Sequence, residues 1–336
     1  MIRYIVRRLL VAVLLLAIIS LVTFGIFFLL PRWMGQSTDD LAARYVGREV
    51  TPELLAGIKT KLGLDKPFLV QYWDFLKGIF VGTDYKFGTD VSHCPAPCMG
   101  YSYRTNQPVL ELLLDRAPVT FSIAIGAAVL WLISGVSIGV LSALRKGSFF
   151  DRAAMSVALA GVSLPIFFTG LLSISVVSYN LHLLPSPDYK PFQDNPALWA
   201  QNLILPWITL AFLYAALYAR LTRAGMLETM GEDYIRTARA KGLKERTVVV
   251  RHGLRAALTP IITIFGLDLG LLLGGAVLTE KTYSMQGLGA LTLQGISRSD
   301  LPVVLGVTIA TALFVILANL VVDILYAVAD PRVRLS

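Results

Sequence analysis

Long apolar runs without charge are the feature that most constrains how this chain can fold. Five runs contain no Asp, Glu, Lys or Arg, and a sixth contains only Asp268. They are 9–30, 119–144, 153–184, 195–219, 256–279 and 301–322. A bilayer core of roughly 30 Å requires about 20 apolar helical residues. We therefore expect an all-α membrane protein with six transmembrane helices.

The overall composition agrees with a membrane protein. Only 15% of the residues are charged, against roughly 25% in soluble domains. The net charge of +8 is more simply explained by membrane topology than by an anionic partner, so we expect no binding to nucleic acid. The first run exceeds a signal-peptide core of about 7 to 15 residues and lacks a small-residue cleavage site. It is therefore expected to remain as a membrane span.

Basic residues in the short loops predict the orientation. The loop after the fourth run carries nine basic residues between Arg220 and Arg255, whereas the two short loops on the opposite side hold three together. Segment 31–118 holds ten more, but its length weakens their effect on topology. We expect both termini in the cytoplasm and segment 31–118 outside.

The predicted organisation has three parts. Residues 1–30 form the cytoplasmic N-terminus and first span, 31–118 the extracytoplasmic segment, and 119–336 a five-span domain with a cytoplasmic loop at 220–258.

The extracytoplasmic segment is expected to be largely helical. Thr51 and Pro52 mark a helix start and Gly63 its end. A second, amphipathic helix is expected over 67–82. It either lies at the membrane surface or packs as a cap on the bundle.

The chain has two cysteines, Cys94 and Cys98, both in the extracytoplasmic segment. An oxidising compartment permits a disulfide between them, and free thiols are the main alternative. A metal site is less favoured, because this pair with His93 falls short of four ligands.

The sequence lacks the motifs of nucleotide hydrolysis and metal catalysis. No Gly-Lys dipeptide and no His-Glu-x-x-His motif occur. We therefore expect this chain to bind no cofactor and no metal. If ATP drives the protein, another chain must bind it.

One motif formally matches a catalytic pattern. Gly135, Ser137 and Gly139 satisfy Gly-x-Ser-x-Gly, which raises the hypothesis of an intramembrane serine protease. However, the motif lies within an expected helix, and His182 is on the order of 20 Å away at 1.5 Å per residue. We prefer a packing role for both glycines, because small residues let helix backbones approach closely in lipid.

The fifth span has a stronger stripe of small residues, Gly266, Gly270 and Gly274. This stripe predicts a close helix contact. Asp268 faces away from the stripe. It either lines a polar passage or is held by a neighbouring polar group.

The loop after the fourth span contains a short helix pattern. Residues 232–242 begin with acids and end with Lys241 and Gly242. Tyr234 and Ala238 are four residues apart, so we expect them to form one small anchor face. The segment is either a basic loop obeying the positive-inside rule or a docking helix for a soluble partner.

The order of several motifs resembles the first permease of the dipeptide/oligopeptide/nickel group of binding-protein-dependent ABC importers. The resemblance covers nearly the whole chain and rests on 3–10, 145–152, 234–242, 252–260, 274–280, 287–289, Asp323 and 330–332. The family's Glu-Ala-Ala-x-x-x-Gly signature falls on Arg236, Thr237, Ala238 and Gly242, and only the last two match its letters. The cysteine-containing segment is not typical of the family.

The resemblance implies a multi-pass permease in the bacterial cytoplasmic membrane. Its implied partners are a second homologous permease forming a heterodimer, two ATPase subunits that carry ATP and Mg, and an extracytoplasmic solute-binding protein. It implies peptide cargo, with nickel or another small solute as the alternative. The ATPase-coupling residues would be Tyr234, Arg236, Thr237, Ala238, Arg239, Lys241 and Gly242.

Overall fold

The computed structural model describes residues 2–35, 37–43, 52–87, 90–102 and 104–329, and these form two compact units. The N-terminal unit comprises 2–118 and 287–313, and the membrane unit comprises 119–286 with the chain from 314 onward. Two long helices, α6 (Val109–Leu144) and α15 (Leu301–Ala329), contribute to both units. Thr51 and the tail after 329 lie outside the described residues.

Among the described residues, five helical stretches are long and apolar enough to span a membrane, or six if one bent pair counts as a span. The five are Leu10–Phe28 within α1 (Ile2–Phe28), α6, α9 (Pro196–Thr229), Glu245–Leu273, which ends in α12 (Arg255–Leu273), and Leu301–Val322 within α15. The expectation of apolar spans is therefore confirmed.

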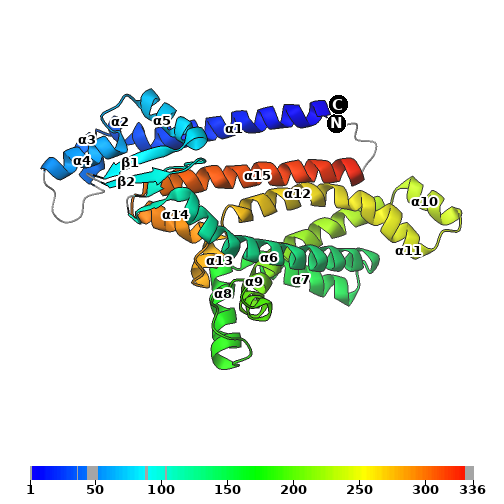
Figure 1. Ribbon diagram of the computed structural model, residues 1–336. Helices are drawn as coiled ribbons and strands as arrows, with labels where there is room; N and C mark the ends of the chain where they lie inside the picture. The colour runs from blue at the N-terminus through cyan, green and yellow to red at the C-terminus, as the bar shows by residue number, and fades with distance from the viewer. Residues whose placement is uncertain (1, 36, 44–51, 88–89, 103, 330–336) are drawn as a thin grey trace. The chain divides into compact units, whose positions relative to one another are not determined.

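The third expected span is a broken helix. It consists of α7 (Phe149–Ser163) and α8 (Ile166–Ser173), which continues into the π-helix η1 (Ile174–Asn180). The two halves are bent by 103°, and Figure 1 shows α8 turning away from α7. Proline disfavours helical backbone at the preceding residue, and Leu164, before Pro165, is extended with φ −88° and ψ 130°. Run length alone did not predict this break.

Two spans are longer than their uncharged runs. Helix α6 begins at Val109, ahead of Asp115 and Arg116, and α9 continues past Arg220 and Arg223 to Thr229. A helix keeps its backbone hydrogen bonds when it leaves the hydrocarbon, where charged side chains are again solvated. The uncharged run therefore marks the membrane-crossing part of a helix and not its ends.

Helix α9 organises the membrane unit. It packs against α7, α8 and α12, and it contributes fully buried Leu203, Leu210 and Tyr218 to the main core. Trp131 from α6 is fully buried in the same cluster. Burial of such side chains against neighbouring helices fixes the positions of the polar residues described below.

The N-terminal unit contains the two expected helices, α4 (Pro52–Leu62) and α5 (Phe68–Val81). Gly63 follows α4 with φ +62°, so the predicted glycine stop is confirmed. Short helices α2 (Leu30–Trp33) and α3 (Thr38–Ala43) precede them, and α14 (Leu288–Ser297) lies before α15.

The N-terminal unit is not purely helical. Strands β1 (Thr83–Phe87) and β2 (Asp90–Cys94) form one antiparallel pair, and β3 (Tyr101–Ser102) and β4 (Gln107–Pro108) form another. The all-α expectation is corrected here, because β1 and β2 satisfy their backbone groups by cross-strand pairing.

Helix α5 has one packed and one exposed apolar face. Phe68, Tyr72 and Phe75 pack around Phe24 of α1. On another face, Leu69, Trp73 and Phe80 are 72%, 66% and 80% exposed. The helix thus packs on α1 and also keeps an apolar face of the kind that suits a membrane surface.

Candidate functional site

The loop after α9 is a folded substructure. It contains α10 (Asp233–Ala240), α11 (Glu245–Thr247) and the π-helix η2 (Val248–Leu254), which leads into α12. Asp233 occupies the first turn of α10 and Arg239 the last, as the helix dipole favours. Gly242 follows with φ +76°, a conformation that favours glycine. The predicted short helix and its glycine stop are confirmed.

The inner face of α10 differs from the expected one. Ile235 and Ala238 are buried against Val248, with Met230 beside them. Tyr234 is 45% exposed whereas Ala238 is only 7% exposed, so the two residues predicted to form one anchor face are not both accessible to a partner. The larger apolar side chain of Ile235 turns this side of the helix inward, and Ala238 lies three residues further along the same side.

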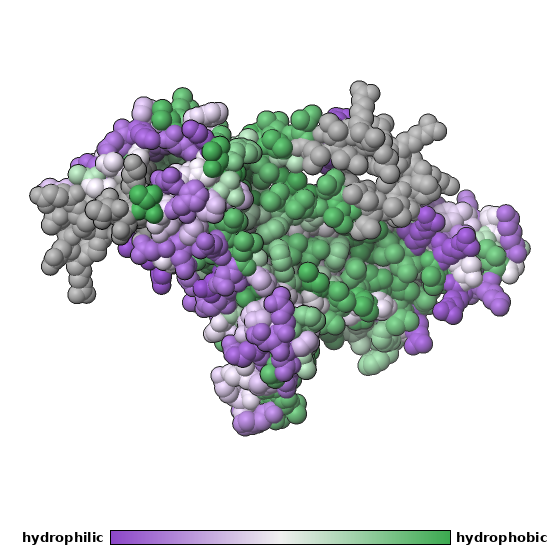
Figure 2. Space-filling model, viewed as in Figure 1, coloured by the Kyte–Doolittle hydropathy of each residue, from purple (hydrophilic) through white to green (hydrophobic). Residues whose placement is uncertain are grey.

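The outward face of α10 is polar apart from Ala240. Arg236, Thr237 and Ala240 are all exposed, and Figure 2 shows hydrophilic residues gathered over α10 and α11 next to hydrophobic helix surface. Lys241 is also exposed.

Arg239 instead holds the substructure together. Its Nη2 and Nε donate to the Glu245 carboxylate at 2.7 and 3.2 Å, and this interaction raises the pKa of Arg239.

The base of the loop is anchored in three helices. Met226 of α9, Val249 of η2, Ala257 of α12 and Ala143 of α6 form one buried cluster. A loop that packs on three helices moves with them, so this substructure has the geometry needed to pass a displacement from the loop to the membrane unit.

An ion pair joins α7 to α9 near the same loop. Arg223 Nε and Nη2 donate to the two Asp151 oxygens at 2.6 and 2.8 Å, and the Gly147 amide donates to Asp151 Oδ2 at 2.9 Å. Bidentate arginine–carboxylate geometry fixes the orientation of both groups. Asp151 was not among the functional residues predicted from the sequence; its signal was an acid within the first turn of a helix capped by Ser148.

Asp268 has a defined partner in the membrane unit. Tyr218 Oη of α9 donates to Asp268 Oδ2 at 2.8 Å. Trp131 stacks on Tyr214 at 4.6 Å between ring centroids, and its ring lies 6.2 Å from that of Tyr218. Of the two hypotheses for Asp268, the structure supplies the neighbouring polar group; the role in a passage stays a prediction.

A second buried acid was missed from the sequence. Glu280 in α13 (Val277–Thr282) is fully buried, and Thr120 Oγ1 donates to its Oε1 at 2.7 Å. Its signal was an acid directly after the apolar run 256–279. Nearby in the chain, Tyr283 Oη lies 2.7 Å from Ser173 Oγ and 2.6 Å from Thr209 Oγ1.

The small-residue positions lie at close helix contacts. A Cβ at Gly135 would lie 3.0 Å from the Ala215 carbonyl of α9, and one at Gly139 would lie 2.6 Å from that of Ala219. A Cβ at Gly266 would meet Val322, and one at Gly270 would meet Val315 and Ala318 of α15. Gly274 differs from these four, because it caps the end of α12.

These contacts give a prediction that separates packing from catalysis. Gly139→Val should overpack α6 against α9 and lower the free energy of unfolding by about 1–3 kcal/mol. Ser137→Ala should leave stability and uptake unchanged, because Ser137 is exposed on the other side of the helix. Thermal unfolding in detergent measures the first effect. Loss of a peptidase activity in Ser137→Ala would instead support the protease hypothesis.

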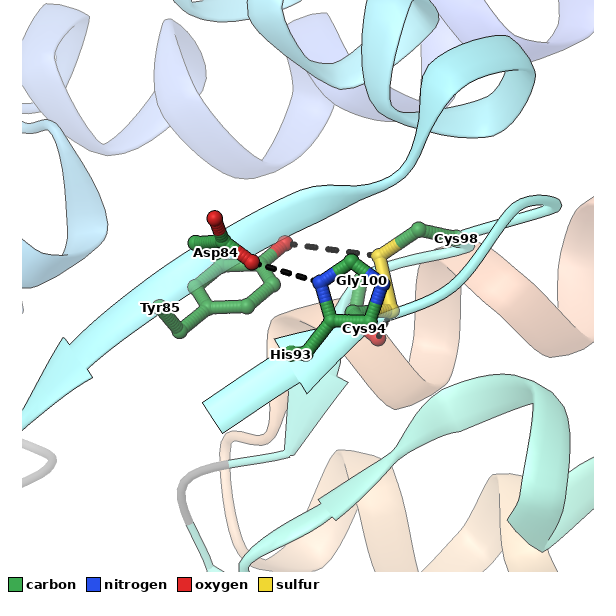
Figure 3. Close-up of a disulfide and its surroundings, with 6 residues drawn as sticks. All are labelled: Asp84, Tyr85, His93, Cys94, Cys98 and Gly100. Atoms are coloured by element: carbon green, nitrogen blue, oxygen red, sulfur yellow. Dashed lines mark hydrogen bonds and ion pairs between the residues drawn. A yellow bond between two sulfur atoms is a disulfide. The ribbon is translucent and has the colours of Figure 1, made fainter. Parts of the chain in front are cut away.

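The two cysteines lie at the end of the β1–β2 hairpin. Cys94 and Cys98 are buried and joined as a disulfide, with Tyr85 Oη 3.9 Å from Cys98 Sγ (Figure 3). Burial raises the pKa of Tyr85 to about 12, so its phenol is neutral here. His93 Nδ1 lies 2.6 Å from Asp84 Oδ1 across the two strands.

Mass analysis checks this bond in the purified chain. Digestion without reductant is expected to yield one peptide species in which Cys94 and Cys98 are linked and resist alkylation. Alkylation of both thiols in an oxidised sample would contradict the disulfide, and a reduced sample serves as the control.

Comparisons with known proteins agree with this architecture. Residues 135–335 match the model of a family described as binding-protein-dependent transport system inner membrane component. Residues 1–124 match the model of the N-terminal part of the same kind of component. The dipeptide transport system permease DppB of Escherichia coli is 35% identical over 357 residues, covering 99% of both chains. The di/tripeptide transport system permease DppB of Pseudomonas aeruginosa is 38% identical over 336 residues, covering 94% of both.

A solved structure shares the fold. The MetNI methionine ABC transporter in inward-facing conformations contains a chain that aligns with a TM-score of 0.50 and 18% identity, covering 66% of this chain and 97% of that one. Together with the full-length sequence similarity, the family matches establish the relationship. This chain belongs to the family of binding-protein-dependent transport system inner membrane components.

Proposed function

We propose that this chain is a permease subunit of an ATP-driven importer for di- or oligopeptides. The observation that carries the proposal is similarity over nearly the whole length to peptide permeases, including the cytoplasmic loop. The substrate class comes from those relatives, which are named for dipeptide and di/tripeptide transport.

The assembly we propose contains four further kinds of component. A second homologous permease forms a heterodimer with this chain, and the passage lies between them. Two ATPase subunits bind ATP and Mg, an extracytoplasmic binding protein delivers the solute, and membrane lipid surrounds the spans. The complex lies in a bacterial cytoplasmic membrane, with six spans and both termini in the cytoplasm.

The folded loop supports the coupling step. Helix α10 presents a polar outward face around Ala240, and its inner face is fixed to η2. A helix face that has a small residue at its centre and polar residues around it can dock in a groove on a soluble subunit. Closure of the ATPase pair would then displace α10 and, through its base, the ends of α6, α9 and α12.

Uptake by the reconstituted importer tests this function. Proteoliposomes holding both permeases and the ATPases should accumulate labelled dipeptides when ATP and the binding protein are supplied. Omission of ATP is the control. Uptake of Ni²⁺ without peptide uptake would favour the nickel alternative, and absence of any ATP-dependent uptake would contradict an importer.

Cysteine labelling tests the proposed orientation. A cysteine replacing Asp188 should react with a membrane-impermeant maleimide in intact cells, because residue 188 is exposed in the segment after η1. A cysteine replacing Lys244 should react only after permeabilisation. The unmodified chain controls for Cys94 and Cys98, and reversed accessibility would overturn the topology.

A further inference from the structure

Helix α5 is attached to the membrane span of α1 at a point well inside that span. Tyr72 Oη donates to the Ala17 carbonyl at 3.2 Å and lies 2.8 Å from Ser20 Oγ. The span ends at Phe28, so Ser20 lies about 12 Å of helix before that end at 1.5 Å per residue. The Tyr72 hydroxyl therefore lies at the depth of the bilayer hydrocarbon.

Contacts on both sides of Tyr72 place the backbone of α5 at a similar depth. Phe68 and Phe75 lie about one turn before and after Tyr72, and their rings are 5.6 and 5.9 Å from that of Phe24. Phe24 itself lies inside the span of α1. Helix α5 therefore lies against α1 within the span and not above it, and Figure 1 shows the two helices beside each other.

The exposed side of α5 is mainly apolar. The exposed apolar residues, which we call the outer face of α5, are Leu69, Val70, Trp73, Phe80 and Val81. The exposed charged residues of this helix are Asp74 and Lys77. Asp74 Oδ2 lies 2.5 Å from Lys66 Nζ, and the long stem of Lys77 allows its ammonium to reach a polar layer. The composition is that of a helix at the boundary between hydrocarbon and headgroups.

The surface of α1 continues the outer face at the same depth. Leu21, Val22 and Ile26 are exposed along the part of the span that carries Phe24. Exposed apolar side chains of a membrane span are surrounded by acyl chains. A soluble protein does not enter this layer, so the depth of α5 favours lipid over an extracytoplasmic partner as the occupant of the outer face.

We propose that α5 is an intramembrane helix whose outer face contacts the acyl chains of one leaflet. The proposed orientation makes this the outer leaflet. The helix has 14 residues, about 21 Å at 1.5 Å per residue, which is too short to cross a hydrocarbon core of roughly 30 Å. It therefore enters the leaflet beside α1 without crossing it, and it anchors the N-terminal unit to the bilayer at a point outside the spans.

The accessibility of spin labels measures this depth. Cys94 and Cys98 are joined as a disulfide, so a single added cysteine can carry the nitroxide. The labelled variants are Leu69→Cys, Trp73→Cys and Phe80→Cys in the complete importer in proteoliposomes. Because these side chains are exposed, the subunit should fold normally. Each label should collide more often with O₂, which partitions into hydrocarbon, than with a water-soluble nickel chelate.

Two reference positions define the scale. Leu21→Cys, one residue after Ser20 on exposed α1 surface, should report hydrocarbon. Asp65→Cys, in the exposed turn before α5, should report water, because an unpaired carboxylate is costly in hydrocarbon. The preference for O₂ at the three outer-face positions should match that at Leu21→Cys and be reversed at Asp65→Cys, only four residues from Leu69.

Two results would overturn the proposal. Preferential collision of the Trp73→Cys label with the nickel chelate would place the outer face in water. Low collision rates with both reagents, or a loss of O₂ access when the binding protein is added, would show that a protein covers this face. The chelate is present on both sides of the bilayer and no transport is measured, so neither result depends on the orientation or on the transported solute.

Discussion

Ala240→Asp is expected to reduce peptide uptake about tenfold or more while the loop remains folded. Ala240 is exposed on the outward face of α10, so an added carboxylate remains solvated in the free subunit. In a docked complex it would be desolvated against the ATPase without a partner, a cost of about 1–3 kcal/mol or more. The measurement is uptake in proteoliposomes together with co-purification of the ATPase.

Ala238→Asp is the matched variant on the inner face. Ala238 is buried against Ile235 and Val248, so the introduced Asp would place a carboxylate in an apolar contact. This costs about 3 kcal/mol or more of the free energy of unfolding. Uptake should also fall, but limited proteolysis should now cut the loop. In Ala240→Asp the loop should resist the protease as the unmodified chain does.

Cross-linking and backbone variants complete this test. A cysteine at Arg236 is expected to cross-link to the ATPase in an active complex. Gly242→Val should impair coupling, because φ +76° costs a branched residue about 1 kcal/mol or more, whereas Gly242→Asn tolerates this backbone better and should be milder. Normal uptake by Ala240→Asp, with no Arg236 cross-link, would show that α10 is not the docking element.

The sequence predicted the membrane-crossing elements well because their physical requirement is local. An apolar run of about 20 residues must be helical in lipid, and this requirement identified the five long apolar helices and the bent pair of the described residues. The break at Leu164 had a local signal in Pro165 that run length ignored. The β1–β2 hairpin was missed because helical expectations were applied to the whole outside segment.

The functional positions were predicted less well because partners lie far apart in the chain. Glu280 accepts a hydrogen bond from Thr120, which lies 160 residues away in the chain. Asp151 likewise pairs with Arg223. The inner and outer faces of α10 could have been assigned from Ile235, whose apolar side chain marks the packed side. The spacing of four from Tyr234 did not show that Ala238 is buried.

Asp268→Asn is expected to lower uptake about tenfold while changing stability little. The amide oxygen of Asn can still accept the hydrogen bond from Tyr218 Oη, which lies 2.8 Å from the present carboxylate. The variant therefore keeps the α9–α12 contact and removes only the charge. An acid within a membrane span is a functional position by default, so loss of charge should impair the passage more than the assembly.

Tyr218→Phe is the control that separates the two roles of Asp268. It keeps the ring beside Trp131 but removes the donor, leaving the Asp268 carboxylate without this hydrogen bond at a cost of about 1–3 kcal/mol. The temperature of thermal unfolding should therefore fall in Tyr218→Phe and remain nearly unchanged in Asp268→Asn. Uptake is normalised to the amount of folded complex for both variants. If Asp268→Asn transports normally, the carboxylate serves only to hold α9 against α12. If both variants lose stability equally, its charge is part of that contact and not of a passage.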